Sequence, residues 1–241
     1  MNYEVVSERK AKPISSNNGT SGIPPLENGD RLTRTEFERR YEAMPEKLKA
    51  ELIEGVVYMA SPVRITNHAK PHSRIMGWLF NYCAATKGVD FADNSTVRLD
   101  QDNEPQPDAV LFIKEDYGGN SSISPDDYLE GSPELVVEIA TGAVSYDTTE
   151  KKKIYRRNGV KEYIIWRVYD RAIDWFAWED GDYAVLEADR NGVIESRLFG
   201  GLRLNVKAML SDDLQKVLAD LQKGLQSKKH KEFLKNLVKK K

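Results

Sequence analysis

The sequence predicts a single α/β core, and two observations support this prediction. Between residues 31 and 210, apolar runs of strand length alternate with segments of helical periodicity, and neither an internal repeat nor a linker interrupts them. The chain has 241 residues, of which 40% are hydrophobic and 31% charged, a balance that is ordinary for a globular protein. This length suffices for one large domain or two small ones, and the unbroken pattern favours one.

The composition excludes several classes of protein. The net charge is −2, so affinity for a polyanion must come from local patches rather than from the chain as a whole. Cys83 is the only cysteine, which rules out an internal disulfide and a zinc finger and fits a reducing compartment. No apolar run approaches the ~20 residues that span a bilayer, and the N-terminus is too polar for a signal peptide, so we expect a cytoplasmic protein.

The first predicted elements follow a polar N-terminal segment. Residues 1–30 include a long stretch rich in Ser, Asn, Gly and Pro, which predicts a flexible arm. Thr33, with a glutamate three residues later, indicates the start of a short helix. The stretch "KAELIEGVVYMAS" predicts strand, turn and strand with the break at Gly55. Residues 72–86 have the apolar spacing of an amphipathic helix.

The second half of the chain alternates strands and helices. We expect strands within 89–113, bent at Pro105 and Pro107, then at Leu135–Ile139, within 161–188 and at 202–206, and helices over Asp147–Asn158 and from Ser211 onward. The polar residues 114–132 predict a loop. Residues 211–241 predict a basic C-terminal helix and tail, which leaves 31–210 as the folded domain.

Two carboxylates occur where a strand should be apolar. Asp108 precedes Ala-Val-Leu-Phe-Ile, and Glu138 lies within Leu-Val-Val-Glu-Ile. An unpaired buried carboxylate is costly, so each acid needs a cation, a metal or a proton beside it, unless it lies at a strand end or on a solvated face. If the two strands are neighbours, both acids can meet at one point. A pair of hard oxygen ligands suits Mg²⁺ or Mn²⁺.

An ordered series of blocks resembles the Uma-type restriction endonucleases, a branch of the PD-(D/E)XK nuclease superfamily. The blocks are "ELIEGVVYMASP", His72 with the helix after it, "QPDAVLF", "SPELVVEI", "DTTEKKKIYRRNGVKEYIIW" and the "DGDY" turn, and they cover residues 31–208. Pro107, Asp108 and Glu138 match the acidic skeleton of the superfamily. The resemblance implies an α/β fold with a PD-(D/E)XK nuclease-like mixed central sheet flanked by helices.

The chain departs from the simplest superfamily pattern at Ala140, where a lysine is expected two residues after Glu138. In the Uma-type branch a lysine on the following helix substitutes for it. The matching block here contains Asp147, Lys151 and Tyr155, which follow one another at intervals of four residues. That spacing places all three on one helical face, so the resemblance implies Lys151 as the substitute.

Two other parts of the matching blocks, the lysines after Lys151 and Glu54, are interpreted separately. Lys152 and Lys153 point elsewhere around the helix, and we interpret them as a solvated face. Glu54 lies just before the glycine turn in "LIEG". The resemblance implies that Glu54 is an additional acid of the site, while an exposed turn residue is the alternative.

The resemblance implies a metal-dependent endonuclease that hydrolyses DNA phosphodiester bonds. Asp108, Glu138 and Glu54 would bind Mg²⁺ or Mn²⁺, and Lys151 would assist water activation or stabilise the transition state. Ala140 keeps open an alternative, a nucleic-acid-binding protein that retains the nuclease fold with weak or no catalysis. A third class is an inert assembly protein that associates through its C-terminal helix. A homodimer would be suited to cutting both strands.

Three further features allow competing interpretations. His68 and His72 have metal-ligand spacing, but Pro71 and the lack of an HExxH motif argue against zinc. The aromatic residues between Trp166 and Trp178 fit strand packing better than base stacking. The C-terminal lysines fit either contacts with a nucleic-acid backbone or a solvated helix end.

Overall fold

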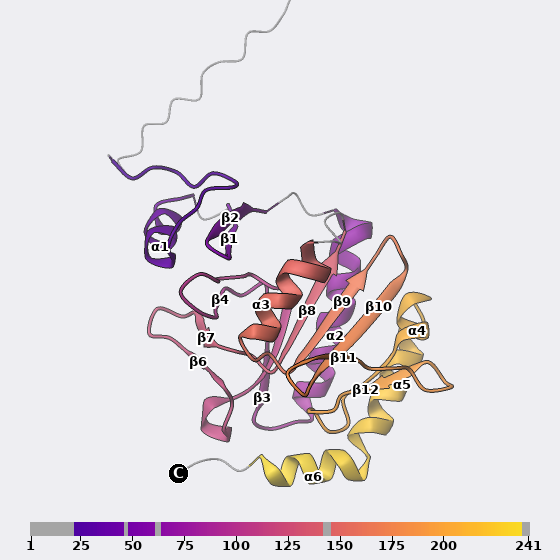
Figure 1. Cartoon of the computed structure of the whole chain (residues 1–241). Helices are drawn as coiled ribbons and strands as arrows, with labels where there is room; N and C mark the ends of the chain where they lie inside the picture. Colours follow the sequence, from indigo (N-terminus) through magenta and orange to yellow (C-terminus); the bar gives the residue numbers. More distant parts are fainter. Residues whose placement is uncertain (1–21, 46–47, 61–63, 142–145, 238–241) are drawn as a thin grey trace, which may run out of the picture.

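The central feature of the fold is a mixed β-sheet (Figure 1). The computed structural model describes residues 22–45, 48–60, 64–141 and 146–237. Within these residues the sheet has the order β11-β10-β9-β8-β5-β3. Its strands are β3 (Val89–Asp93), β5 (Ala109–Ile113), β8 (Leu135–Ala140), β9 (Glu162–Arg167), β10 (Ala172–Glu179) and β11 (Asp182–Val185). Strands β8 and β9 are parallel and the other neighbours are antiparallel, which confirms the expected mixed sheet.

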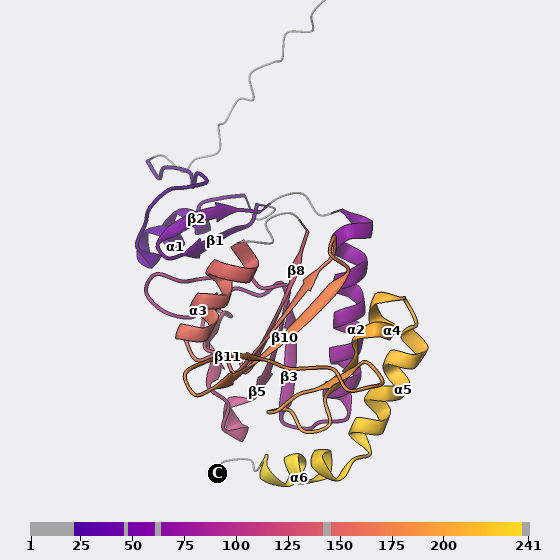
Figure 2. The ribbon, with the colours of Figure 1, turned by 45° about the vertical axis from the view of Figure 1, so that its right-hand side comes forward.

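Helices cover both faces of this sheet (Figure 2). On one face lie α2 (Lys70–Ala84), α4 (Val206–Leu210) and α5 (Leu214–Leu225), and on the other lies α3 (Lys152–Arg157). Alternate strand residues supply the two cores, because successive side chains of a strand point to opposite faces. Val137 packs with Trp78 and Leu221 on the first face, whereas Val136 packs with Tyr155 on the second.

A small lobe precedes the sheet in the chain. It consists of α1 (Arg34–Glu42) and the hairpin of β1 (Ala50–Ile53) and β2 (Val56–Met59). The Thr33 hydroxyl accepts a hydrogen bond from the Glu36 amide at 3.4 Å, as the sequence predicts for the helix start. Leu26 is buried against Phe37 in the lobe core. Leu26 belongs to the segment predicted as a flexible arm, of which residues 1–21 lie outside the described residues.

The remaining elements are short or terminal. They are β4 (Val97–Arg98), β6 (Ser121–Ile123), β7 (Leu129–Gly131), β12 (Val193–Glu195), β13 (Arg203–Asn205), the π-helical turns η1 (Ile65–Ala69) and η3 (Tyr146–Lys151), the 3₁₀ turn η2 (Glu115–Tyr117) and α6 (Lys228–Asn236). The segment predicted as a polar loop contains η2, β6 and β7, since strands of three residues carry too little alternation to be recognised. No helix in the described ranges is long and apolar enough to cross a membrane.

The C-terminal helices belong to the core of the molecule. Val217 and Leu221 of α5 are buried in the larger core cluster. The chain crosses itself closely at Gly201 and Gly224, where a Cβ atom on Gly224 would lie 2.0 Å from the Gly201 carbonyl oxygen. Helix α6 lies across the end of the molecule remote from the N-terminal end of α2 (Figure 1).

A buried acid, Glu104, lies beside Glu38 of the lobe and makes stability depend on pH. Burial, followed by the adjacent carboxyl group of Glu38, raises the pKa of Glu104 from 4.5 to about 8, against the opposing effect of Arg98. The folded state therefore retains a proton that the unfolded state releases between these two values. The free energy of unfolding should fall as the pH rises through this window.

Chemical denaturation at a series of pH values measures this effect. The variant Glu104→Gln should lose most of the decrease, because an amide imitates the protonated carboxyl group in shape and charge. An unchanged slope in the variant would assign the pH dependence to another group.

Candidate active site

The two acids predicted inside strands come from neighbouring strands of the sheet. In the antiparallel pairing of β5 with β8, Ala109 lies opposite Val137. Continuing this register by one residue sets Asp108 opposite Glu138. The Asp108 Oδ2 atom accepts a hydrogen bond of 2.6 Å from the backbone amide of Ile139. The strands of the two acids are therefore neighbours, and Asp108 is held against the backbone of β8 one residue beyond Glu138.

A lysine from the next helical segment reaches the same point. The Lys151 Nζ atom lies 3.0 Å from Glu138 Oε1 and 2.8 Å from Glu51 Oε1. Its side chain is 6% exposed and that of Glu138 5%, so the pair is held away from bulk solvent. The Tyr155 hydroxyl donates to the same Glu138 oxygen at 2.8 Å. Lys151 and Tyr155 thus share the helical face that their spacing predicts, while the Asp147 side chain lies outside the described residues.

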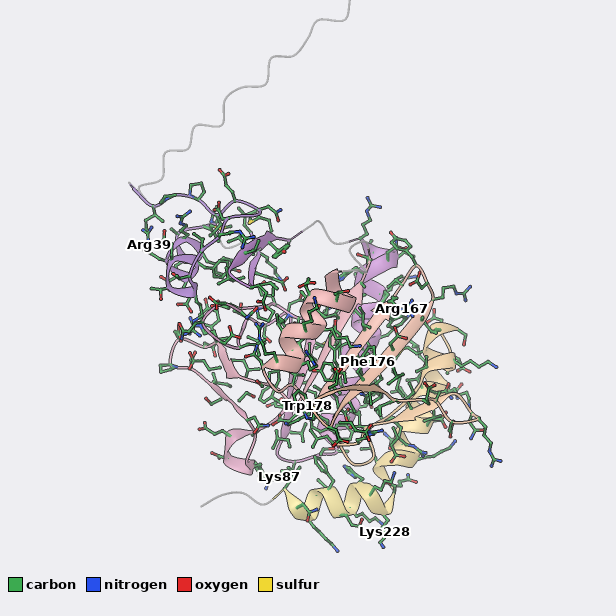
Figure 3. All side chains as sticks on the ribbon, in the orientation of Figure 1. Arg39, Lys87, Arg167, Phe176, Trp178 and Lys228 are labelled. Atoms are coloured by element: carbon green, nitrogen blue, oxygen red, sulfur yellow. The ribbon has the colours of Figure 1, made fainter. Side chains whose placement is uncertain are left out.

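Two further lysines follow Lys151 and do not join this cluster. Lys152 Nζ lies 3.6 Å from the centre of the Phe176 ring on β10. Lys153 Nζ pairs with Glu150 at 3.0 Å and is exposed. Figure 3 shows Phe176 and Trp178 along the sheet, where both are partly buried in the core under α3, so packing accounts for this aromatic group.

The lobe supplies an acid that differs from the predicted one. Glu51, on β1, accepts hydrogen bonds from Lys151 and from the backbone amide of Gln106, the latter at 2.7 Å. Glu54 instead lies at the turn with a φ of 52° and forms an ion pair with Arg157, its side chain 44% exposed. The Glu54 side chain pairs with Arg157 and not with Lys151. Successive strand side chains point to opposite faces, so Glu51 and Glu54, three residues apart, point in different directions.

Two histidines hold Asp108 from the side of α2. His68 Nε2 lies 2.9 Å from Asp108 Oδ1. His72 Nε2 lies 2.8 Å from the Asp108 carbonyl oxygen and 3.0 Å from Asp93 Oδ1. The two histidines therefore contact the carboxylate and the backbone of one aspartate rather than forming a zinc site between themselves.

Tyr155 is held as a neutral hydrogen-bond donor. Complete burial, and then the charge of Glu138, raises the pKa of its hydroxyl well above the ordinary value. A neutral hydroxyl donates to the Glu138 carboxylate, as the 2.8 Å contact requires. Glu138 consequently receives one neutral and one cationic donor on the same oxygen.

A third strand acid has a different role. Glu162, at the start of β9, is buried and accepts hydrogen bonds from Trp175 Nε1, Ser196 Oγ and the backbone amides of Arg197 and Leu198, all at 2.8–2.9 Å. These donors all belong to the protein framework. An acid inside an apolar strand is thus not sufficient to identify a reactive site.

The acids in this region carry the type of oxygen ligand that suits a hard divalent cation. Asp108, Glu138 and Glu51 provide carboxylate oxygens, the ligands that Mg²⁺ and Mn²⁺ prefer. Among the described residues, no three His, Cys, Asp or Glu side chains gather into a ready metal-binding group. The positive charge between Glu51 and Glu138 is supplied by Lys151.

Comparisons with known proteins identify the family and the fold. Residues 34–207 match the family described as "Uma2: Putative restriction endonuclease", nearly the same span as the sequence blocks. A similar solved structure is the crystal structure of a "putative nuclease belonging to DUF820" from Anabaena variabilis, with a TM-score of 0.57 and 14% identity. The similarity covers 72% of this chain and 96% of that chain, and at this identity it concerns the fold. None of the curated proteins matches the chain. Because the family match spans most of its length, the chain belongs to the Uma2 family.

Proposed function

We propose that this protein is a metal-dependent endonuclease that hydrolyses DNA phosphodiester bonds. The observation that supports the proposal is the ion pair of Lys151 with Glu138, on the strand that pairs with the one following Asp108. Membership of a family described as restriction endonucleases supports the reaction class. The absent lysine at Ala140 does not count against catalysis, since the ammonium group of Lys151 reaches Glu138 from the helix.

The residues of the cluster have separate roles in this proposal. Asp108 and Glu138 would hold a Mg²⁺ or Mn²⁺ ion, with Glu51 in the place we predicted for Glu54. When bound there, such an ion would supply a Lewis acid that lowers the pKa of a water molecule and offsets charge on the phosphate. Lys151 stabilises the negative charge that develops on the phosphate oxygens.

The remaining contacts orient these groups. His68 holds one oxygen of Asp108, and the amide of Ile139 holds the other. The hydroxyl of Tyr155, on α3, donates to the Glu138 carboxylate and so restricts the orientation of that carboxylate. Groups that are fixed before the substrate arrives need no reorganisation during the reaction.

Cleavage of supercoiled plasmid tests the proposal. Wild-type protein should nick the plasmid with Mg²⁺ or Mn²⁺, and EDTA should abolish the reaction. Asp108→Ala should lose the activity, because it removes a carboxylate that would hold the ion. Cleavage at the wild-type rate by this variant would exclude the assignment, and binding without nicking by the wild type would favour the alternative of an inactive DNA-binding protein.

The plasmid experiment also tests the oligomeric state of the protein. A homodimer would place two sites on one duplex and convert plasmid to the linear form in one encounter, whereas a monomer would produce nicked circles first. Light scattering on the same sample distinguishes the two assemblies.

A further inference from the structure

Two large apolar side chains are exposed beside the candidate active site. Tyr169, in the turn between β9 and β10, is 59% exposed, and Ile65, in η1, is 73% exposed. Single exposed apolar side chains are common, but several that lie close together mark a candidate binding surface. The turn and the N-terminal end of α2 lie at the same end of the sheet (Figures 1 and 2).

Hydrogen bonds connect η1 and the turn to the candidate site. The Asn67 side-chain amide donates to the Tyr169 hydroxyl at 2.9 Å, which joins η1 to the turn. His68, next to Asn67, contacts Asp108. On the other side, the amide of Val168 donates to the carbonyl oxygen of Ala140 at 3.1 Å, two residues beyond Glu138. The ring of Tyr169 is therefore held in place relative to the acids.

Three cations belong to the same two segments. Arg64 and Lys70 flank η1, and Arg171 ends the turn; all three are exposed. Among the described residues none of them forms an ion pair within 4.0 Å. The acid in the same turn, Asp170, is neutralised by Arg167. We call Arg64, Ile65, Lys70, Tyr169 and Arg171 the rim.

We infer that the rim binds a nucleic-acid strand with an unpaired base, which stacks on Tyr169 while the three cations contact the neighbouring phosphates. Aromatic side chains and basic residues together are the usual components of single-strand binding surfaces. Bases in an intact duplex are stacked on one another and cannot cover a protruding ring. The inference rests on the proposed nuclease function and specifies its substrate class as single-stranded or locally unpaired nucleic acid.

Fluorescence anisotropy in EDTA tests the stacking contact without cleavage. The probes are a labelled oligothymidylate and a labelled duplex of equal length. The wild type should prefer the single strand, and Tyr169→Ala should weaken that binding about tenfold, the effect of losing one stacked base. Tyr169→Phe keeps the ring and should stay within about threefold of the wild type. Phe80→Ala is the matched control, because Phe80 is also 59% exposed and lies ~15 Å along α2 from Lys70.

Salt dependence tests the phosphate contacts. For single strands the logarithm of affinity falls with that of salt concentration by ~0.7 for each phosphate neutralised. Arg171→Ala and Lys70→Ala should each reduce the slope by about this amount. Lys87→Ala should leave it unchanged, since Lys87 lies at the opposite end of the molecule from Arg167 (Figure 3).

Three results would overturn the inference. They are no binding of the single strand by the wild type, equal affinity of Tyr169→Ala and wild type for it, or a change from dimer to monomer in Tyr169→Ala, which would make the rim a protein interface. The plasmid assay decides the nuclease function separately. If the protein cleaves plasmid but the rim variants bind the single strand as well as the wild type, only this inference is rejected. If the rim binds the single strand but the protein does not cleave, only the proposed nuclease function is rejected.

Discussion

Replacing Lys151 with Met should slow metal-dependent cleavage by ~10²-fold or more and lower the free energy of unfolding by ~3–5 kcal/mol. The rate falls because the positive charge beside Glu138 is lost. The stability falls because Glu51 and Glu138, both largely buried, keep their carboxylates without the shared cation at 2.8 and 3.0 Å. Methionine retains the length and volume of the lysine stem, so the change removes mainly charge.

Plasmid cleavage and urea denaturation measure the two effects separately. Mg²⁺ should stabilise Lys151→Met more than the wild type, because a divalent cation can replace the missing charge between the acids. Lys153→Met is the matched control: Lys153 is exposed and paired only with Glu150 among the described residues, so its loss should change stability by less than ~0.5 kcal/mol. A Lys151→Met protein with normal cleavage would remove the lysine from the mechanism.

Glu51→Gln should reduce cleavage by ~10²-fold, while Glu54→Gln should remain within about twofold of the wild type. The two acids lie three residues apart on the same hairpin, yet only Glu51 contacts Lys151. Glutamine has nearly the same size as glutamate, so the comparison isolates the charge. The same steady-state plasmid assay gives both numbers under identical conditions.

The reverse order of effects would restore Glu54 to the site and show that the hairpin shifts when substrate binds. The thermal midpoint of both variants serves as the control for folding. Glu51→Gln retains an acceptor for the Gln106 amide through its side-chain oxygen, so a large loss of stability is not expected.

The central strands β5 and β8 could be predicted from the sequence because they are almost wholly apolar. The stretch from Leu135 to Ala140 is buried at every position, and the sequence predicts it directly. The approach of Lys151 to Glu138 also followed from local information, since helical spacing sets the face that Lys151 shares with Tyr155.

The rest of the site depends on contacts between distant segments. The contact of Glu51 with Lys151 was not predicted, although Glu51 is an acid inside a strand, the same signal that drew attention to Glu138. Glu54 was chosen because it matches a family block beside the glycine. The contact of His68 with Asp108 requires the start of α2 to meet the start of β5, which no local pattern specifies. Glu162 is also a buried strand acid, at the start of β9, but its hydrogen-bond donors are framework groups, which only the structure shows.

The crossing of Gly201 and Gly224 limits how this protein can be divided for expression. The segment that matches the family ends at residue 207, before α5. A fragment cut there would expose the apolar surface that Val217 and Leu221 now cover, and would aggregate more readily than the whole chain. Recombinant versions intended for crystallisation or assay should therefore extend through α6.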